Sequence, residues 1–384
     1  MKIKYTKLPP ALPKFYKYIK EEISFCVKGK LLCAPYAAAT CTRCGACLQR
    51  CPSFKALKSE LYSPRGRSQL VRFLYEGKLN PEQDKKDILN TTYSCLMCGA
   101  CSSFCPAKTP VADLMFFVNS VLAKRKIKIP VLLRNFLYLP LAKLKIRNAL
   151  KSQPRLKQEC LFIASHGSAE NIKTAVKLLN TAGFKVKVSF ALMKAEQYYF
   201  AADLAKLKQC FLSLQKQIKE GQIIITDCST IYALFKKAGI IFPQFKDMTQ
   251  KMKFITCFIK NDKHFSADLK GRKILIHQNN MPSDWDILQK EISALLYCPS
   301  QIFLLECIES KDIISAAATA WVKIKATGLI KNISLRQLKQ YNADFIITAC
   351  YTDKKFFEYL IRKHKLNIKV LHILQIPQYF YAQK

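Results

Sequence analysis

The spacing of apolar residues along the chain changes near residue 126 and again near residue 158. In the first part, apolar side chains recur at helical spacing, as at Leu70, Phe73 and Leu74 and across Ala112–Lys124, so this part is predicted to be mainly helical. From Cys160 onward, short apolar runs alternate with amphipathic stretches. That alternation predicts βαβ units with mostly parallel sheets.

Seven short apolar runs are predicted strands: Cys160–Ala164, Val186–Phe190, Ile223–Thr226, Ile274–His277, Ile302–Leu305, Phe345–Thr348 and Val370–Ile373. Five amphipathic segments are predicted helices: Asn171–Ala182, Asp203–Lys219, Asp284–Leu296, Ile313–Lys325 and Lys354–His364. An internal repeat supports this order, because Ile224–Thr230 matches Ile346–Thr352 and each copy ends a strand at a cysteine. We therefore expect two related α/β units, at residues 158–265 and 266–384.

Residues 126–157 form a basic, amphipathic segment between the two parts. Such a segment can touch a membrane surface, here through residues 126–150, or it can be a connector that docks on its own protein. The docked connector is the commoner outcome. No apolar run reaches the length of about 18 residues that a transmembrane helix needs. Residues 1–35 are expected to be an extension without a signal peptide.

The formal net charge of +37 has two interpretations. It can attract nucleic acid, anionic lipid or an acidic protein, or it can belong to a solvated lysine-rich surface. The lysines are scattered and far outnumber the arginines, whereas base and phosphate recognition relies on arginine. Nucleic-acid binding is therefore not expected.

Eight of the seventeen cysteines form two copies of the motif Cys-x-x-Cys-x-x-Cys-x-x-x-Cys-Pro. The copies comprise Cys41, Cys44, Cys47 and Cys51, and then Cys95, Cys98, Cys101 and Cys105. Two-residue gaps let three thiolates from one loop reach three irons of a [4Fe–4S] cluster, while the fourth cysteine usually serves the other cluster. The motif therefore predicts two [4Fe–4S] clusters, one on Cys41, Cys44, Cys47 and Cys105, the other on Cys95, Cys98, Cys101 and Cys51.

Zinc is the alternative metal, but zinc sites typically use two separated Cys-x-x-Cys pairs. Without an export signal, the other cysteines are expected to be reduced, in the cytoplasm or at the inner face of its membrane. Cys228 and Cys350 lie at predicted helix N-termini, which lower a thiol pKa, although a packing role is commoner there. His166 and His277 end strands and could line a site, although a structural role is commoner for each.

No glycine-rich nucleotide-binding motif follows a strand, so the chain is not equipped to bind flavin or nicotinamide. Iron–sulfur clusters move electrons one at a time, so oxidising an organic substrate needs a flavin on a partner subunit. The expected fold class is α+β and multidomain. A mainly helical two-cluster ferredoxin-like domain at residues 36–125 precedes the connector and the two α/β repeats.

The two cysteine motifs, the intervening Ser63-Pro64-Arg65-Gly66-Arg67 and the two α/β units resemble the iron–sulfur subunit of glycolate oxidase. They are similar more broadly to iron–sulfur subunits of anaerobic glycerol-3-phosphate dehydrogenase and to heterodisulfide-reductase-like proteins. The resemblance implies a non-catalytic electron-transfer subunit. Its flavoprotein partner would oxidise a 2-hydroxy acid such as glycolate or lactate, and electrons would reach a quinone or another carrier. Arg65 and Arg67 would then dock the partner or hydrogen-bond the clusters, unless they serve only surface solubility.

The chain departs from that family because the Cys-Cys-Gly signature usual in each repeat is absent. The remaining candidates in the repeats are Cys160, Cys228, Cys307 and Cys350. Two other functions therefore stay open. One is a cluster-bearing interaction module that uses the repeats as a binding platform. The other, suggested by charge alone, is a nucleic-acid-associated iron–sulfur protein.

Overall fold

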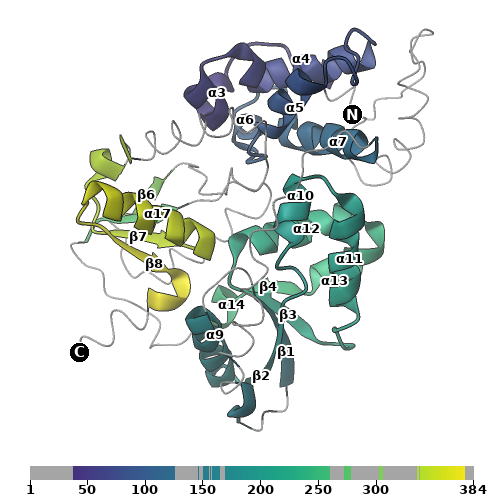
Figure 1. The fold of residues 1–384 in the computed structure, drawn as a ribbon. Coiled ribbons are helices and arrows are strands. Elements are labelled where there is room, and N and C mark those ends of the chain that lie inside the picture. The colour runs from purple at the N-terminus through teal and green to yellow at the C-terminus, as the bar shows by residue number, and fades with distance from the viewer. Residues whose placement is uncertain are drawn as a thin grey trace.

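Figure 1 shows a computed structural model of the chain, coloured from the N-terminus to the C-terminus. The structure describes residues 38–125, 146, 150–154, 156, 158–164, 169–259, 272–277, 302–305, 335–336 and 338–376. Several predictions lie outside these residues: the extension at 1–35, the membrane contact and most of the connector at 126–157, the helices at 284–296 and 313–325, His166 and Cys307.

The N-terminal part is helical, as its apolar spacing predicts. Its elements are η1 (Leu48–Arg50), α3 (Pro52–Leu57), η2 (Glu60–Tyr62), α4 (Pro64–Tyr75), α5 (Lys85–Tyr93), α6 (Ala100–Ser103) and α7 (Val111–Lys124). Leu70 and Leu74 on α4 are buried in a core shared with α5 and α7, and Phe73 is half-buried. The helices thereby fix the loops that carry the eight motif cysteines.

The first α/β unit contains a parallel sheet. Its elements are β1 (Gln158–Ile163), α9 (Ala169–Thr181), β2 (Phe184–Ser189), α10 (Ala195–Phe200), α11 (Leu204–Gln215), β3 (Ile223–Thr226), α12 (Ser229–Ile241), η3 (Pro243–Phe245), α13 (Lys246–Gln250), β4 (Met252–Phe254) and α14 (Thr256–Ile259). The strand order is β2-β1-β3-β4, and every pair is parallel. Strands β1 and β3 are buried on both faces, which explains their continuous apolar runs.

The second unit contains another parallel sheet. Its described elements are β5 (Ile274–His277), β6 (Ile302–Leu305), β7 (Phe345–Thr348), α17 (Tyr351–His364), β8 (Lys369–His372) and η5 (Ile373–Gln375). The order β6-β5-β7-β8 reproduces the order of the first sheet. All seven predicted strands are present, each within two residues of its expected ends. The division of the chain into the stated domains stays a prediction.

In the first unit, the structure adds elements that were not predicted, namely α10, η3, α13, β4 and α14, and α12 was expected only as a helix that begins after Cys228. Strand β4 has only three residues, and the charged Lys253 interrupts its apolar pattern. Helix α12 buries one face, but apolar residues such as Ala233 and Ile240 lie outside that face and obscure the helical periodicity in the sequence.

The helical part packs against both α/β units. Phe116 on α7 stacks on Tyr199 of α10 with ring centroids 4.6 Å apart. Lys237 on α12 forms an ion pair with Asp113 on α7, with 3.0 Å between Nζ and Oδ1. On the other side, Leu96 and Ala100 belong to one core cluster with Phe357 of α17. Met97 belongs to the core cluster of the first unit, so residues 95–101 touch both sheet-containing units.

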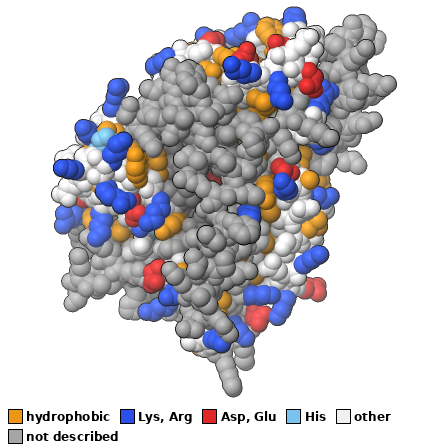
Figure 2. Space-filling model, viewed as in Figure 1, with side chains coloured by type: hydrophobic (Ala, Val, Ile, Leu, Met, Phe, Trp, Pro, Cys, Tyr) orange, Lys and Arg blue, Asp and Glu red, His pale blue; other side chains and the backbone are white. Residues whose placement is uncertain are grey.

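The surface charge is dispersed. Figure 2 shows lysine and arginine side chains scattered over the visible face rather than collected in one patch. Among the described residues, none of the helices has the length and apolar content needed to span a bilayer.

Candidate iron–sulfur site

The two cysteine motifs fold into loops with the same unusual backbone conformation. The third residue of each motif, Arg43 in the first and Met97 in the second, has a positive φ of 59° and 52°. The fifth residue, Gly45 or Gly99, also has a positive φ, of 82° and 73°. Non-glycine residues rarely adopt this conformation. Its recurrence at equivalent positions indicates that both loops wrap the same kind of group.

The first loop lies beside the last cysteine of the second motif. Burial, together with the neighbouring thiols of Cys41, Cys105 and Cys51, raises the pKa of Cys47 to about 11. Cys44 is exposed, and hydrogen bonding by the Ala46 backbone lowers its pKa. The structure thus brings Cys105 next to the loop of the first motif.

The second loop is deeper and lies beside the last cysteine of the first motif. Burial raises the pKa of Cys95 to about 11 and that of Cys101 well above its usual value. Cys98 and Cys51 contribute to both increases. Cys51 is therefore near the second loop, as the predicted exchange of ligands requires, although it also lies within range of Cys47.

Backbone N–H groups donate to three of the motif sulfurs. Cys51 precedes α3, and its Sγ accepts from the amide of Phe54 at 3.5 Å. The amides of Met97 and Thr109 donate to Cys95 Sγ and Cys105 Sγ, each at 3.4 Å. Such bonds favour the thiolate form and raise the reduction potential of a cluster bound to it.

Arg67 is buried against the second group of cysteines. Only 1% of the residue is exposed. Its guanidinium donates to Thr91 O at 3.1 Å, Ser94 Oγ at 2.9 Å and Cys51 Sγ at 3.6 Å. No carboxylate among the described residues forms an ion pair with it. Burial acts to lower the pKa of Arg67, but Cys95, Cys51 and Cys101 outweigh burial, so the pKa is raised.

The other residues of the Ser63–Arg67 segment shape the two loops. Ser63 caps α4 by accepting from the amide of Gly66 at 2.8 Å. A Cβ on Gly66 would come within 2.1 Å of Glu60 O, so only glycine fits. Arg65 pairs with Glu60 at 2.6 Å and donates to Arg43 O at 3.3 Å, which ties helix α4 to the first cysteine loop.

The donor set suits a multi-iron cluster better than a single ion. Among the described residues, no three Cys, His, Asp or Glu side chains lie close enough to hold one metal ion. A zinc site needs such closeness, because four ligands surround one atom. A [4Fe–4S] cluster binds each cysteine to a different iron, so its thiolates lie farther apart. The thiolates that bind such a cluster would also compensate the buried positive charge of Arg67.

Comparison with known proteins agrees with this geometry. Residues 37–109 match the family model described as a 4Fe-4S dicluster domain. We call residues 37–109 the dicluster domain after this similarity. The dicluster domain extends beyond both cysteine motifs and includes the whole Ser63–Arg67 segment.

Several named proteins match this chain over 87 to 99 residues each. A probable glycolate oxidase iron–sulfur subunit from Bacillus subtilis (strain 168) is 32% identical over 87 residues, covering 22% of this chain and 19% of that protein. The glycolate oxidase iron–sulfur subunit of Escherichia coli (strain K12) is 29% identical over 91 residues, covering 24% and 21%. An Hdr-like menaquinol oxidoreductase iron–sulfur subunit 2 from Archaeoglobus fulgidus is 25% identical over 99 residues, covering 22% and 18%. The chain thus matches about a fifth of each relative's length.

Two features near the site were not apparent from the sequence. The burial of Arg67 was undecided there, because Arg65 and Arg67 occupy similar positions in one short motif. The contact between Cys228 and Cys350, 3.7 Å between the two Sγ atoms, was also not predicted. Its sequence signal was the internal repeat, which places both cysteines at the end of a strand.

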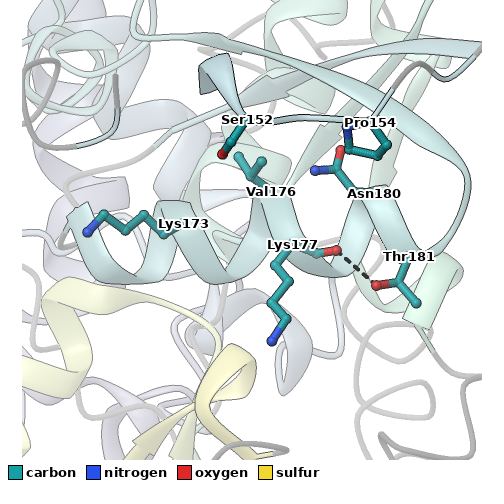
Figure 3. Close-up of a pocket in the computed structure, with 7 residues that line it drawn as sticks. All are labelled: Ser152, Pro154, Lys173, Val176, Lys177, Asn180 and Thr181. Atoms are coloured by element: carbon teal, nitrogen blue, oxygen red, sulfur yellow. Dashed lines mark hydrogen bonds between the residues drawn. The ribbon is translucent and has the colours of Figure 1, made fainter. Parts of the chain in front are cut away.

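The α/β units also carry a shallow pocket of about 430 Å³ beside α9 (Figure 3). Its lining residues are Ser152, Pro154, Lys173, Val176, Lys177, Asn180 and Thr181. It contains no thiol or carboxylate, and it lies apart from the dicluster domain.

Proposed function

We propose that the dicluster domain holds two [4Fe–4S] clusters and that the chain is an iron–sulfur electron-transfer subunit. In this proposal, one cluster is bound by Cys41, Cys44, Cys47 and Cys105, and the other by Cys95, Cys98, Cys101 and Cys51. Each cluster, when bound, accepts and donates one electron. The protein residues hold the two clusters in one folded unit, because each motif contributes its last cysteine to the other's site.

The buried Arg67 is the observation that carries the proposal. A guanidinium with 1% exposure is costly unless a negative group compensates it. Its described partners are neutral oxygens and the sulfur of Cys51. A cluster bound by four thiolates provides the missing negative charge. Arg67 would then stabilise that cluster through a charge-assisted hydrogen bond to its ligand.

The first cluster would be closer to solvent than the second, so electrons would have one accessible point of exchange. Cys44 is exposed, whereas Cys98 and Cys101 are buried. A cavity of about 360 Å³ adjoins the first loop and is lined by Leu48, Gln49, Arg50, Phe54, Lys55 and Lys58. Its basic residues suit an acidic electron carrier or partner surface. Electrons would therefore enter or leave at the first cluster.

We propose further that a flavoprotein partner oxidises a 2-hydroxy acid of the glycolate or lactate type, and the relatives named as glycolate oxidase iron–sulfur subunits support the choice of substrate class. Electrons would pass through the clusters to a quinone or another carrier. The Hdr-like relative supports a second version, in which the clusters serve a menaquinol oxidoreductase. In either version, the units at 158–265 and 266–384 are proposed to be repeats, supported by their common strand order.

Anaerobic purification with iron and sulfide analysis tests the cluster proposal. We expect about eight irons and eight sulfides per chain, and low-temperature EPR of the reduced protein should show two interacting centres. Cys44→Ser should lower the iron content, whereas Cys210→Ser, a half-buried cysteine outside the motifs, should not. About four irons, or zinc in place of iron, would contradict two clusters.

The partner is tested by co-purification. A flavoprotein should copurify with the chain, and glycolate or lactate should then reduce the clusters. A chain that stays alone, and whose clusters no hydroxy acid reduces in cell extract, would favour the interaction module instead.

A further inference from the structure

Cys228 and Cys350 form a close pair between the two α/β units. Cys228 follows β3 and precedes α12, and Cys350 follows β7 and precedes α17. Their Sγ atoms are 3.7 Å apart, and the residues are only 2% and 3% exposed. The amide of Ser229 donates to Ala349 O at 2.8 Å, so the two backbones are joined beside the thiols.

The pair occupies the position where open parallel sheets usually bind ligands or do chemistry. In the order β2-β1-β3-β4, the connections diverge between β1 and β3, and in β6-β5-β7-β8 they diverge between β5 and β7. Sites form at the carboxyl ends of the strands at such a point. Cys228 and Cys350 follow those ends in the two sheets, and they meet.

Buried acid–base groups accompany the two thiols. The hydrogen bond to the Cys228 thiol and burial raise the pKa of Cys350, and Asp353 in the first turn of α17 is close enough to add to this increase. His277 at the end of β5 is 3.3 Å from Asp353, between Nε2 and Oδ2, and both side chains are buried. Asp227, which precedes Cys228, is buried with Oδ1 unpartnered among the described atoms. Packing alone does not account for polar groups that are this costly to bury.

We propose that Cys228 and Cys350 are a redox-active dithiol that closes reversibly to a disulfide. The Sγ–Sγ bond forms as two S–H bonds break, which releases two protons and two electrons. Side-chain rotation must bring the sulfurs from 3.7 Å to about 2 Å, the length of a disulfide bond. Asp353 and Glu196 are the carboxylates whose charges act on Cys350, so they are the groups placed to accept the protons.

The electron acceptor of this dithiol is taken from the proposed function, so this step rests on that proposal. Burial keeps bulky thiols and disulfides away from the pair, so exchange with an external disulfide is hindered. Met97 of the second cysteine loop belongs to the same core cluster as Cys228 and Cys350, and Cys95 packs against that cluster. Two oxidised [4Fe–4S] clusters, each accepting one electron, balance one disulfide. The dithiol would thus store two electrons, which the clusters transfer one at a time.

The test uses the full, cluster-loaded chain reduced with dithionite and then oxidised in two ways. Diamide oxidises thiols directly, and ferricyanide withdraws electrons one at a time through the clusters. Acid quenching, alkylation and peptide mass spectrometry then report which cysteines are linked. We expect a disulfide-linked peptide pair containing Cys228 and Cys350 with both oxidants. Cys160, which is equally buried in β1, should remain alkylatable after unfolding.

Variants provide a second readout. Cys228→Ala and Cys350→Ala should each abolish the linked peptides and remove two electrons from the reductive titration of the oxidised protein. Cys160→Ala should change neither result. The mass-spectrometric test on the unaltered chain stands even where a variant fails to fold.

The outcomes separate this inference from the proposed function. If iron and EPR analysis find the clusters but neither oxidant links the cysteines, the dithiol proposal is wrong and the relay stands. A linkage with diamide and not with ferricyanide supports the couple and rejects its connection to the clusters. A linkage in a chain without clusters supports the couple and rejects the relay. Extra bound metal that both cysteine variants lose would make the pair metal ligands and would overturn the proposal.

Discussion

Replacing Arg67 by methionine would remove a buried positive charge from the second group of cysteines. Its guanidinium Nη1 lies 3.6 Å from Cys51 Sγ. Two unit charges at that distance interact by about 4–5 kcal/mol at an effective dielectric constant of about 20. An electron added to a cluster spreads over several irons and sulfides, so we take about half of this energy, about 2 kcal/mol. At about 2.3 kcal/mol per 100 mV, Arg67→Met should lower that cluster's reduction potential by about 100 mV.

The variant is expected to fold, because the two oxygens that accept hydrogen bonds from Arg67 belong to groups that are also hydrogen-bonded to each other. Ser94 Oγ donates to Thr91 O at 2.9 Å, so both keep a hydrogen bond when the guanidinium is removed. Methionine also fills a similar volume without a charge that needs compensation. In the cluster-free protein, the substitution should therefore cost little stability or even raise it.

The assay is a redox titration followed by EPR for the unaltered protein and three variants. Arg67→Lys keeps the charge but loses the forked geometry, so its potential should lie between those of the unaltered protein and Arg67→Met. Arg65→Met is the matched control for the second cluster, because Arg65 lies beside the first cysteine loop instead, is partly exposed and is already paired with Glu60. Solvent and salt screen it, so its shift should stay below about 20 mV. If Arg67→Met moves neither potential by more than the Arg65 control, the placement of Arg67 beside a cluster is refuted.

Three further predictions concern ligand exchange, the interface and pH. Cys51→Ser should remove the cluster that the second motif binds, and Cys105→Ser should remove the cluster that the first motif binds. Each variant should lower the iron content from about eight to about four per chain. Loss of the cluster of the motif that contains the substituted cysteine would contradict the exchange of ligands. Lys237→Met should lower the free energy of unfolding in urea by about 1.5–3 kcal/mol, because its charge-assisted hydrogen bonds to Asp113 and Tyr199 are lost; Lys236→Met, its neighbour, is the control. Burial lowers the pKa of His372 to about 3, so the unfolded chain binds the extra proton between pH 6.5 and 3. Stability should therefore fall as pH drops through that window, and His372→Asn should flatten the dependence; an unchanged slope would contradict it.

The strands and several helices could be predicted because their signal is local. Strand β5 (Ile274–His277) is apolar throughout, and α9 (Ala169–Thr181) repeats its apolar residues at helical spacing, so each segment reveals its own burial. Strand β4 (Met252–Phe254) could not be recognised in this way. It becomes a strand because β3 offers its edge to residues 252–254, and that edge exists only after the sheet forms.

The candidate cluster ligands could be proposed from the sequence, because cluster binding requires a fixed spacing along a short loop. That spacing selected eight cysteines, and the repeated Gly45 and Gly99 indicated matching loops, which the backbone conformation of both loops shows. The roles of Arg65 and Arg67 could not be separated, since two residues of one helical turn carry the same charge. Packing decided between them: Arg67 is buried beside α5 and the second loop, whereas Arg65 is partly exposed beside the first loop.

By itself, the sequence determined the chemistry of the first part of the chain and the periodicity of the second. Those properties depend on residue type and on separations of a few residues, which the chain fixes before it folds. Tertiary structure alone decided which distant groups meet. It placed a buried cation against thiols 16 residues away and joined two cysteines 122 residues apart. Such contacts depend on how sheets and helices pack against one another, and no local pattern of residues encodes that packing.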